Sequence, residues 1–239
     1  MLKALIFDVD GTLADTEMAH LAAFNHAFKE EGFDWHWDVE LYTRLLEISG
    51  GKERIRAYWE TREGMPKEVG HDAIQQTVSR LHEIKTAAYE QAVQDGAVQV
   101  RPGVLALLSE ASAAGLHLAI ATTTSPVNIA ALLKKAIGPD WRCHFQVIED
   151  ASTAPRKKPE PMVYLQTLSH LGVAASQCLA FEDSENGLRA ARAAALATVI
   201  TPNDFTATHN FSGALRILPN LGGVGVAQLR EWNQAHRQV

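Results

Sequence analysis

Acidic side chains follow two apolar runs of the sequence. Asp8 and Asp10 come after "ALIF", and Glu182 and Asp183 end the stretch "CLAFED". Aspartate has a reference pKa of about 3.9, so Asp8 and Asp10 should both be ionised at neutral pH and repel each other unless a positive group lies beside them. Carboxylates from two such runs, with no His or Cys directly beside the acids, favour a hard cation with oxygen ligands. Their small number suits Mg²⁺ better than Ca²⁺.

Hydroxyl and basic side chains follow two other apolar runs. Thr122, Thr123 and Thr124 come after "LHLAIA", and Lys157 and Lys158 precede a proline. Each group has an ordinary alternative: "DGT" is a common turn, a lysine before proline is usually solvated, and threonine is a normal strand residue. Together, hydroxyl donors, a cation and a metal site are what a transferring phosphoryl group needs, because its charge spreads over oxygens that must be held and neutralised. The sequence therefore predicts a phosphoryl-transfer site.

Short apolar runs alternate with helical patterns through most of the chain. This alternation predicts an α/β fold with a doubly wound, Rossmann-like, mostly parallel sheet and helices on both faces. In such sheets the ligand crevice lies beyond the carboxyl ends of the strands, where the acidic, hydroxyl and basic residues described above are expected. The expected strands lie within residues 3–9, 116–123, 145–150, 178–183 and 197–201, and the expected helices within residues 102–115, 125–138, 161–172 and 185–195.

The segment after the first expected strand is organised differently. Residues 16–94 contain no candidate for a buried strand and show helical patterns at 18–32 and 72–93. We therefore expect two domains. One is a discontinuous α/β core made of residues 1–15 and 95–239, and the other is an all-helical domain of residues 16–94 inserted into it.

The composition limits the classes of protein to consider. The chain has 239 residues, of which 46% are hydrophobic, which is enough for a substantial core. Its 22 basic and 28 acidic residues give a net charge of −6 without a dense basic cluster, so we expect no nucleic-acid partner. Two distant cysteines argue against a disulfide framework or a cysteine zinc site, and no apolar run approaches the roughly 20 residues of a membrane span. We expect a cytoplasmic monomer that acts on a small molecule without a membrane partner.

Four short motifs occur along the chain: "DVDGT", "ATTTS", "RKKPEP" and "FEDSENG". They resemble the four motifs of the haloacid dehalogenase superfamily, and the resemblance extends over the whole chain. It implies that Asp8 is the nucleophile, which forms an aspartyl-phosphate, and that Asp10 protonates the leaving alkoxide and then activates water. It also implies that Thr122 and Lys158 hold the phosphoryl oxygens. Motif alignment leaves open which of the three threonines points inward and whether Lys157 takes the place of Lys158.

The same resemblance implies a metal site and a lid. Mg²⁺ would be bound by Asp8, the backbone carbonyl of Asp10 and Asp183, with Glu182 at or near the metal. The inserted helices are similar to the small cap of the family, which closes over the site and shuts out water between steps.

The stretch "EISGGKERIRAY" in the cap is the most informative one about the substrate. Two adjacent glycines permit a tight loop, and the basic residues after them have an alternative as exposed residues of an ordinary amphipathic helix. Together with "DVDGTLADTE" and "TPNDFTA", "GGKERI" resembles the CbbY-type sugar-bisphosphate phosphatases of carbon fixation. That resemblance implies hydrolysis of the C1 phosphate of xylulose 1,5-bisphosphate to xylulose 5-phosphate. The expected substrate-binding residues are then Glu17, His20, Lys52, Arg54, Lys85, Thr123 and Thr124, with Arg56 as a further candidate.

Three alternative functions stay open at this point. A β-phosphoglucomutase-like phosphomutase shares the motifs and the small cap, and the loop "GGKERI" favours the phosphatase over it only mildly. A phospho-signalling receiver module shares the paired acids, the hydroxyl residue and the lysine. The long helical insertion argues against a receiver, because a switch needs an exposed site. The third alternative is a non-catalytic binding protein, against which the four intact motifs argue.

Overall fold

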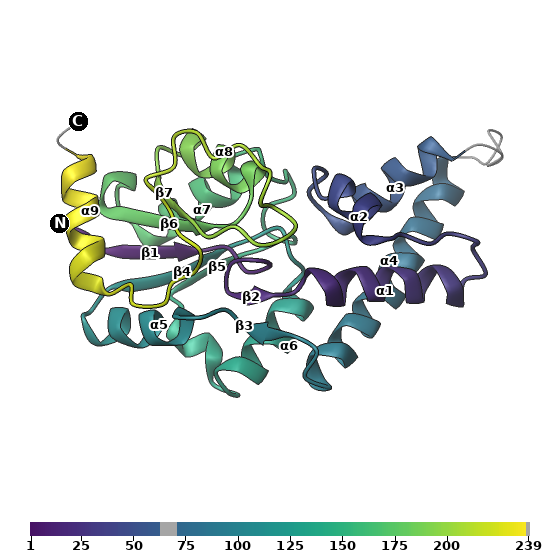
Figure 1. The fold of residues 1–239 in the computed structure, drawn as a ribbon, viewed down its shortest axis with the longest axis horizontal. Helices are drawn as coiled ribbons and strands as arrows, with labels where there is room; N and C mark the ends of the chain where they lie inside the picture. The colour runs from purple at the N-terminus through teal and green to yellow at the C-terminus, as the bar shows by residue number, and fades with distance from the viewer. Residues whose placement is uncertain (63–70, 238–239) are drawn as a thin grey trace.

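The computed structural model describes residues 1–62 and 71–237 and contains a six-stranded parallel sheet (Figure 1). The strand order is β5-β4-β1-β6-β7-β8, and each neighbouring pair runs parallel. The strands are β1 Ala4–Phe7, β4 His117–Ala121, β5 Val147–Glu149, β6 Cys178–Glu182, β7 Ala197–Ile200 and β8 Arg216–Ile217. This sheet confirms the predicted α/β fold.

Each of the five predicted apolar runs contains one of these strands. The sixth, β8, is missing from the prediction because both of its residues are exposed and the sequence there has no apolar run. Strand β1 pairs with β4 on one side and with β6 on the other, and its four residues are fully buried. Its carboxyl end, where Asp8 follows, therefore lies between the ends of β4 and β6.

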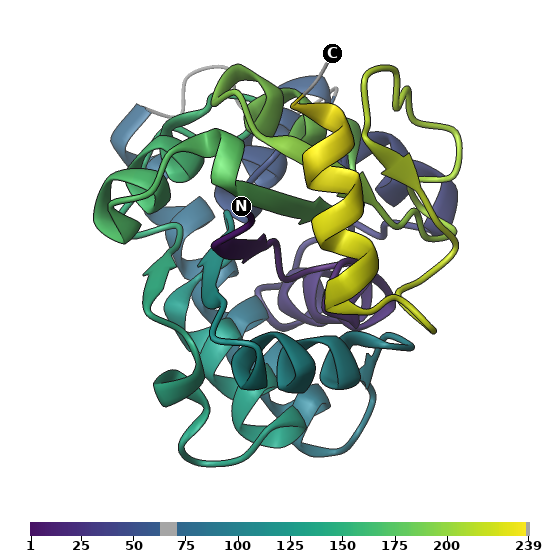
Figure 2. The ribbon, with the colours of Figure 1, turned by 90° about the vertical axis from the view of Figure 1, so that its left-hand side faces the viewer.

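Helices cover both faces of the sheet, because alternate residues of β1 point to opposite sides (Figure 2). Leu5 and Phe7 belong to a core cluster that includes α5, α6 and α9. Ala4 and Ile6 belong to a second cluster that includes α7 and α8. The elements concerned are α5 Val104–Ala113, α6 Pro126–Ala136, α7 Met162–Leu171, α8 Glu185–Ala193 and α9 Val226–His236, with short 3₁₀ helices η1 Trp141–His144 and η2 Ala175–Gln177.

The inserted helices occupy one end of the molecule, beyond the carboxyl ends of the strands (Figure 1). They have a core of their own that is rich in aromatic residues, among which Phe24, Phe28, Trp37 and Tyr42 are at most 1% exposed. No strand occurs in the described part of residues 16–94, as predicted. The helices are α1 Glu17–Glu30, α2 Val39–Leu45, α3 Gly51–Thr61 and α4 His71–Gln94, of which only α1 and α4 match a predicted helical stretch.

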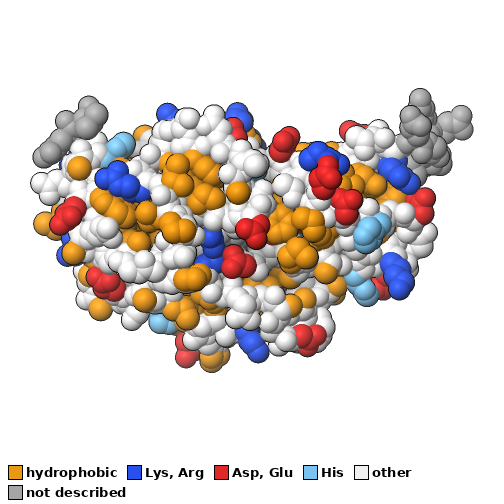
Figure 3. Space-filling view, in the orientation of Figure 1, with side chains coloured by type: hydrophobic (Ala, Val, Ile, Leu, Met, Phe, Trp, Pro, Cys, Tyr) orange, Lys and Arg blue, Asp and Glu red, His pale blue; other side chains and the backbone are white. Residues whose placement is uncertain are grey.

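The chain passes between the two parts twice, and the two passes lie side by side. Strand β2, Ala14–Asp15, pairs antiparallel with β3, Gln99–Val100. The surface is indented where the two parts meet, and acidic and basic side chains are interspersed on the face shown in Figure 3. In the part of the chain that the structure describes, no helix has both the length and the apolarity to cross a bilayer.

Candidate active site

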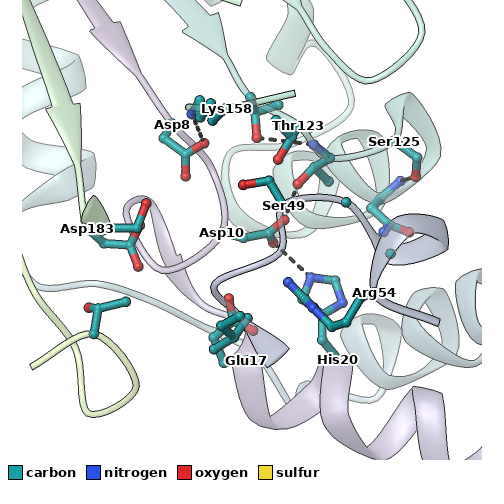
Figure 4. A pocket seen from close by; sticks show the side chains of 18 of the residues that line it. Asp8, Asp10, Glu17, His20, Ser49, Arg54, Thr123, Ser125, Lys158 and Asp183 are labelled. Carbon is teal, nitrogen blue, oxygen red and sulfur yellow. Dashed lines mark hydrogen bonds and ion pairs between the residues drawn. The ribbon is translucent and has the colours of Figure 1, made fainter. Parts of the chain in front are cut away.

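A pocket lies between the carboxyl ends of the strands and the inserted helices (Figure 4). The sheet domain contributes residues that follow β1, β4 and β6, and the insertion contributes residues of α1, α4 and the loop before α3. Most of the predicted site residues line this pocket: Asp8, Asp10, Glu17, His20, Arg54, Lys85, Thr122, Thr123, Thr124, Lys158 and Asp183. The fold therefore brings together, at the carboxyl ends of the strands, residues that are far apart in the sequence.

Lys158 makes three hydrogen bonds at the end of β1. Its ammonium group donates to carboxylate oxygens of Asp8 (2.6 Å) and Glu182 (2.6 Å) and to the backbone carbonyl of Ala121 (2.9 Å). Burial alone would lower the pKa of Lys158, but the charges of Asp8 and Glu182 raise it above its ordinary value. The neighbouring Lys157 instead donates to a backbone carbonyl of its own loop (3.0 Å). The structure thus brings Lys158, and not Lys157, to the acidic side chains.

Three buried carboxyl groups meet beside this lysine. Carboxylate oxygens of Asp8, Glu182 and Asp183 all lie within 4.8 Å of one another. Burial and the neighbouring negative charges outweigh the effect of Lys158 and raise the pKa of Asp8 to about 7. The same causes raise the pKa of Asp183 well above its usual range. Because one ammonium group cannot neutralise three carboxylates, the residues present fit a divalent cation between them.

The three carboxylates differ in how their oxygens are used. One oxygen of Glu182 accepts from the lysine and from the hydroxyl of Tyr164 (2.5 Å), and the other accepts from the backbone N–H of Asp183 (3.3 Å). Asp183 accepts from the side-chain amide of Asn203 (2.8 Å) at one of its oxygens. Within the described residues, Asp8 and Asp183 each keep an oxygen without a protein donor. Glu182 therefore fits a position beside a cation, and Asp8 and Asp183 fit direct ligation.

Gly11 explains the "DGT" turn after β1. Its φ angle is +74°, and a Cβ atom there would lie 2.3 Å from a carboxylate oxygen of Asp183 and 2.6 Å from the amide nitrogen of Asn203. Glycine therefore lets the loop after β1 approach the loops after β6 and β7 this closely. The buried guanidinium of Arg101 joins the same loops, because it donates to the carbonyls of Gly11 (2.5 Å) and Thr201 (2.5 Å).

Asp10 has different partners from Asp8. Nε2 of His20 lies 3.0 Å from one oxygen of Asp10, and the hydroxyl of Thr124 donates to the other. The ammonium group of Lys85 lies 2.7 Å from Nδ1 of His20; since it can only donate, Nε2 carries the proton that is given to Asp10. Burial would raise the pKa of Asp10, but His20 and Thr124 lower it well below its usual range. Two carboxyl groups one residue apart thus have opposite pKa shifts.

The three threonines after β4 have different roles in the local structure. Thr122 is 1% exposed, and its hydroxyl accepts from the backbone N–H of Thr124 (3.3 Å). Thr124 reaches Asp10, and Thr123 lines the pocket (Figure 4). Ser125 then caps α6 by accepting a hydrogen bond from a backbone N–H of its first turn. The cap fixes where the loop ends, so all three hydroxyl groups come from one short, anchored segment.

The inserted helices bring one acidic side chain, two cations and two histidines to the pocket. Glu17 accepts from the hydroxyl of Tyr42 (2.7 Å). The guanidinium of Arg54 is buried and donates to the backbone carbonyls of Leu45 at the end of α2 (3.0 Å) and of Ile48 in the loop before α3 (3.1 Å). Burial lowers the pKa of Lys85 to about 8. The positive charge on the insertion's side of the pocket therefore comes from Arg54 and Lys85.

Lys52 and Arg56 do not line the pocket. Lys52 is exposed, with its ammonium group 3.3 Å from the hydroxyl of Ser79, and Arg56 forms a hydrogen bond with Gln75 on α4. The reason is helical periodicity: α3 turns Arg54 and its neighbours inward, so residues two positions away lie on the opposite side. The sequence shows a cluster of basic residues, and the geometry of α3 brings Arg54 alone among the three to the pocket.

The sequence predictions miss several residues that line or support the site, and four of them show why. Asn203 follows β7, so inspection of the fifth apolar run, like the other four, would have found it. Tyr42 and Tyr164 come from helices and carry no local signal for their carboxylate partners. His82 lines the pocket, and a Cβ at Gly51 would lie 2.8 Å from its ring. Burial and the nearby cations lower the pKa of His82 to about 3.

Residues 2–195 match the family model of the haloacid dehalogenase-like hydrolases. The chain belongs to this family. The match covers β1, the whole insertion and the sheet strands up to β6, which carry the four motifs and the pocket described above. This haloacid dehalogenase-like hydrolase is an enzyme of the phosphatase type, as the sequence predicts.

Proteins called CbbY are among its relatives. The plasmid-encoded protein CbbY of Cupriavidus necator is 55% identical over 221 residues, which are 92% of this chain and 86% of that protein. The crystal structure of CbbY from Rhodobacter sphaeroides in complex with phosphate has a TM-score of 0.89 and 39% identity, and the match covers 96% of this chain and 100% of that one. A mutant of that protein in complex with xylulose-(1,5)bisphosphate matches with the same TM-score and identity, over 96% and 99% of the two chains.

Proposed function

We propose that this chain is a Mg²⁺-dependent sugar-phosphate phosphatase that works through an aspartyl-phosphate on Asp8. The observation that carries the proposal is the pair of carboxyl groups one residue apart, Asp8 beside Lys158 and Asp10 beside His20, with opposite pKa shifts. Different environments for two neighbouring carboxyl groups separate the duties of nucleophile and acid–base catalyst.

In the first step a carboxylate oxygen of Asp8 attacks phosphorus, and the bond between phosphorus and the sugar oxygen breaks. Asp10 gives a proton to that oxygen, so the sugar leaves as an alcohol. Asp10 rests as a carboxylate, and the negative charge of the incoming phosphoryl group raises its proton affinity, so that it takes up a proton before this step. Thr122 and Lys158 hold the phosphoryl oxygens by hydrogen bonds.

In the second step a water molecule attacks the phosphorus of the aspartyl-phosphate. The carboxylate of Asp10 takes the proton of the water, the bond between phosphorus and Asp8 breaks, and inorganic phosphate leaves. The hydrogen bonds from His20 and Thr124 support this step, because they keep Asp10 deprotonated and fix its orientation.

Asp8, Asp183 and the backbone carbonyl of Asp10 are the groups proposed to hold Mg²⁺, with Glu182 beside it. When bound, the metal supplies positive charge that offsets the buried carboxylates and the phosphoryl oxygens. The chain prepares the site through Asn203, whose amide holds one oxygen of Asp183 at 2.8 Å and leaves the other available.

We further propose that the substrate is xylulose 1,5-bisphosphate, which with water gives xylulose 5-phosphate and inorganic phosphate. Arg54 and Lys85 lie on the insertion's side of the pocket and suit the phosphate group that does not react, by charge-assisted hydrogen bonds. The similar R. sphaeroides protein, whose mutant was crystallised with this bisphosphate, supports the choice. Residues of one chain line both sides of the pocket, which supports a monomeric enzyme.

The main alternatives differ in the fate of the phosphoryl group. A signalling receiver needs its acidic residue exposed to a partner, whereas Asp8 here is 6% exposed. A β-phosphoglucomutase-like enzyme would return the phosphoryl group to the sugar instead of passing it to water. The released phosphate therefore separates the proposal from both alternatives.

The test is a phosphate-release assay with xylulose 1,5-bisphosphate, with and without Mg²⁺, alongside a panel of sugar monophosphates. We expect one phosphate per sugar, loss of activity with a chelator and recovery when Mg²⁺ is returned. Formation of glucose 6-phosphate from β-glucose 1-phosphate with little free phosphate would contradict the proposal and favour the mutase. A phosphorylated aspartate that persists for minutes without turnover would favour the receiver.

A further inference from the structure

The loop between α2 and α3 forms part of the pocket wall. Its residues Leu46, Ser49 and Gly50 line the pocket together with Gly51, the first residue of α3, and Figure 4 shows Ser49 and Asp10 among the side chains of the pocket. On the insertion's side, the guanidinium of Arg54 holds the loop, because it donates to the carbonyl of Leu45, where α2 ends, and to that of Ile48 within the loop. The position of this loop relative to the sheet domain therefore decides the shape of the pocket on its substrate side.

Asn186 of the sheet domain reaches across to this loop. Its side-chain amide donates to the backbone carbonyl of Glu47 (2.8 Å) and lies 3.3 Å from the hydroxyl of Ser49. Asn186 belongs to the first turn of α8, directly after the segment that carries Asp183 and Ser184. Within residues 1–62 and 71–237, no other side chain of the sheet domain hydrogen-bonds to residues 45–51.

We propose that Asn186 is a positioning residue that latches the loop before α3 onto the sheet domain and so sets the affinity for substrates that reach the cap. This inference rests on the proposed function, because it concerns how the same pocket selects a sugar bisphosphate. The two antiparallel chain passes, β2 and β3, lie on one side of the junction, and α8 with the loop before α3 lies on the other (Figure 1). Opening about the β2–β3 connection would break both hydrogen bonds of Asn186 at once.

A neighbouring apolar contact supports the latch. The ring of Phe205, from the loop after β7, packs edge-on against the ring of Tyr42 on α2, with 5.9 Å between the two ring centres. Phe205 thereby packs against the aromatic core of the insertion. Tyr42 also donates to Glu17, so the same end of the insertion holds a pocket carboxylate. The ring contact is less directional than a hydrogen bond, so it tolerates sliding, whereas the amide of Asn186 specifies one seated position.

Asn186 does not itself line the pocket, which separates its role from that of a catalytic residue. Its effect should depend on how far a substrate extends toward the insertion. A sugar bisphosphate that spans the pocket needs the loop in place, whereas a small aryl phosphate such as p-nitrophenyl phosphate needs only the acids, the lysine and the metal of the sheet domain. The latch therefore predicts that loss of Asn186 lowers kcat/KM for the bisphosphate but not for the aryl phosphate. A general defect in the fold would lower both.

The test compares two variants with a matched control on the same helix. Asn186→Ala removes the side chain, and Asn186→Asp keeps its shape but removes the donor. Arg189→Ala, at an exposed position of α8, is the control. We expect kcat/KM for xylulose 1,5-bisphosphate to fall about tenfold in both variants, given two hydrogen bonds of ordinary strength, and kcat/KM for p-nitrophenyl phosphate to stay within about twofold of the wild type. The control should change neither.

Hydrogen–deuterium exchange gives a measurement that does not depend on the substrate. In the substrate-free enzyme, peptides that cover residues 45–51 should exchange faster in both Asn186 variants than in the wild type or in Arg189→Ala. Unchanged exchange there, or an equal loss of activity toward both substrates, would overturn the latch. Failure of the wild type to release phosphate from xylulose 1,5-bisphosphate would count against the proposed substrate alone, and the exchange data would still decide the latch.

Discussion

The two sides of the pocket hold their charged groups in different ways. On the sheet side, acidic groups follow the central strands, and Asp8 is anchored by the backbone of β1, whose neighbours are β4 and β6. On the insertion's side, the cations Arg54 and Lys85 form no ion pair with a carboxylate of the described residues, whereas Lys158 forms two, and they rest on aromatic rings. The guanidinium of Arg54 lies 5.2 Å from the ring centre of Tyr42, and the ammonium group of Lys85 lies 5.0 Å from that of Phe24.

This difference suggests a division of labour in the molecule. Strand ends fix Asp8 and Glu182 to within hydrogen-bonding distance of Lys158, and the negative charge that this lysine leaves over fits a divalent cation. The aromatic core of the insertion, in contrast, fixes cations that face the pocket and complement the second anionic group of a substrate. The predictions below test whether chemistry and recognition separate along this line, beginning with the largest expected effect.

Replacement of the proposed nucleophile should abolish the chemistry without disturbing recognition. Asp8→Asn removes the attacking oxygen and a metal ligand together, so kcat should fall by about 10,000-fold or more. Phosphate release under saturating substrate measures the loss, and circular dichroism and thermal unfolding check the fold. Retention of a tenth of the wild-type rate would contradict the assignment of the reaction to the sheet side.

Removal of the buried lysine should damage both activity and stability. Lys158→Met keeps the volume but leaves Asp8 and Glu182 without their shared cation, so we expect a loss of about a thousandfold in kcat/KM. Because an uncompensated buried charge is costly, the free energy of unfolding in the presence of a chelator should fall by about 3 kcal/mol. Lys157→Met is the matched control, since the ammonium group of Lys157 donates to a loop carbonyl and not to the carboxylates of the site. Equal effects of the two substitutions would show that the ion pairs of Lys158 are unimportant.

On the insertion's side, substitutions of two cations of α3, Arg54 and Lys52, should differ in their effect on KM. Arg54→Lys loses the planar fork that holds one carbonyl at the end of α2 and one in the loop before α3, so KM for the bisphosphate should rise about tenfold while kcat changes little. Lys52→Ala should change KM by less than about twofold, because its ammonium group is exposed and outside the pocket. Steady-state kinetics of both variants make the comparison, and a larger effect at Lys52 would reverse it.

The pH dependence of substrate binding should report Lys85. Burial and the charge of Arg54 lower its pKa from 10.5 to about 8, against the opposing effect of Asp10 and Glu17. Above pH 8 the folded enzyme loses this cation next to His20, so KM should rise a few-fold between pH 7 and pH 9.

The lowered pKa of Lys85 also affects stability, and in the opposite direction: raising the pH weakens substrate binding but stabilises the fold. The unfolded chain binds more protons than the folded one between pH 8 and 10.5, so this group makes the free energy of unfolding increase with pH in that range.

In Lys85→Met the KM should already be high at pH 7 and lack the further rise. A pH-independent KM in the wild type would exclude the role of Lys85.

The same division explains what the sequence could predict. Asp8, Asp10, Thr122, Lys158 and the two acids at the end of β6 lie where apolar runs end. Parallel sheets bring such ends to one edge, so topology alone assembles these residues. The register of a run cannot show which of several adjacent residues points inward. The packed loops decide this: Lys158 and not Lys157 donates to Asp8, and the hydroxyl of Thr124 donates to Asp10.

The insertion was less predictable, because its geometry depends on packing between helices. Helix α2 has a cap signal in Asp38, whose side chain accepts from the N–H of Leu41 (2.8 Å), but it is too short to show a clear apolar period. Asn186 illustrates the same limit: it lies in a predicted motif, yet its partners are 137 and 139 residues away in the sequence.

The most direct test of the central claim is to find the phosphoryl group on the protein. Wild-type enzyme and the Asp10→Ala variant, in which both proton transfers and therefore both steps should be slowed, would be mixed with xylulose 1,5-bisphosphate and Mg²⁺ and quenched in acid at a series of times from milliseconds to minutes. The peptides would then be analysed by mass spectrometry. The account predicts a hydroxylamine-labile phosphate on Asp8 of the wild-type enzyme, which forms and decays more slowly in the variant. Turnover without a labelled Asp8, or a phosphate on another residue, would contradict it.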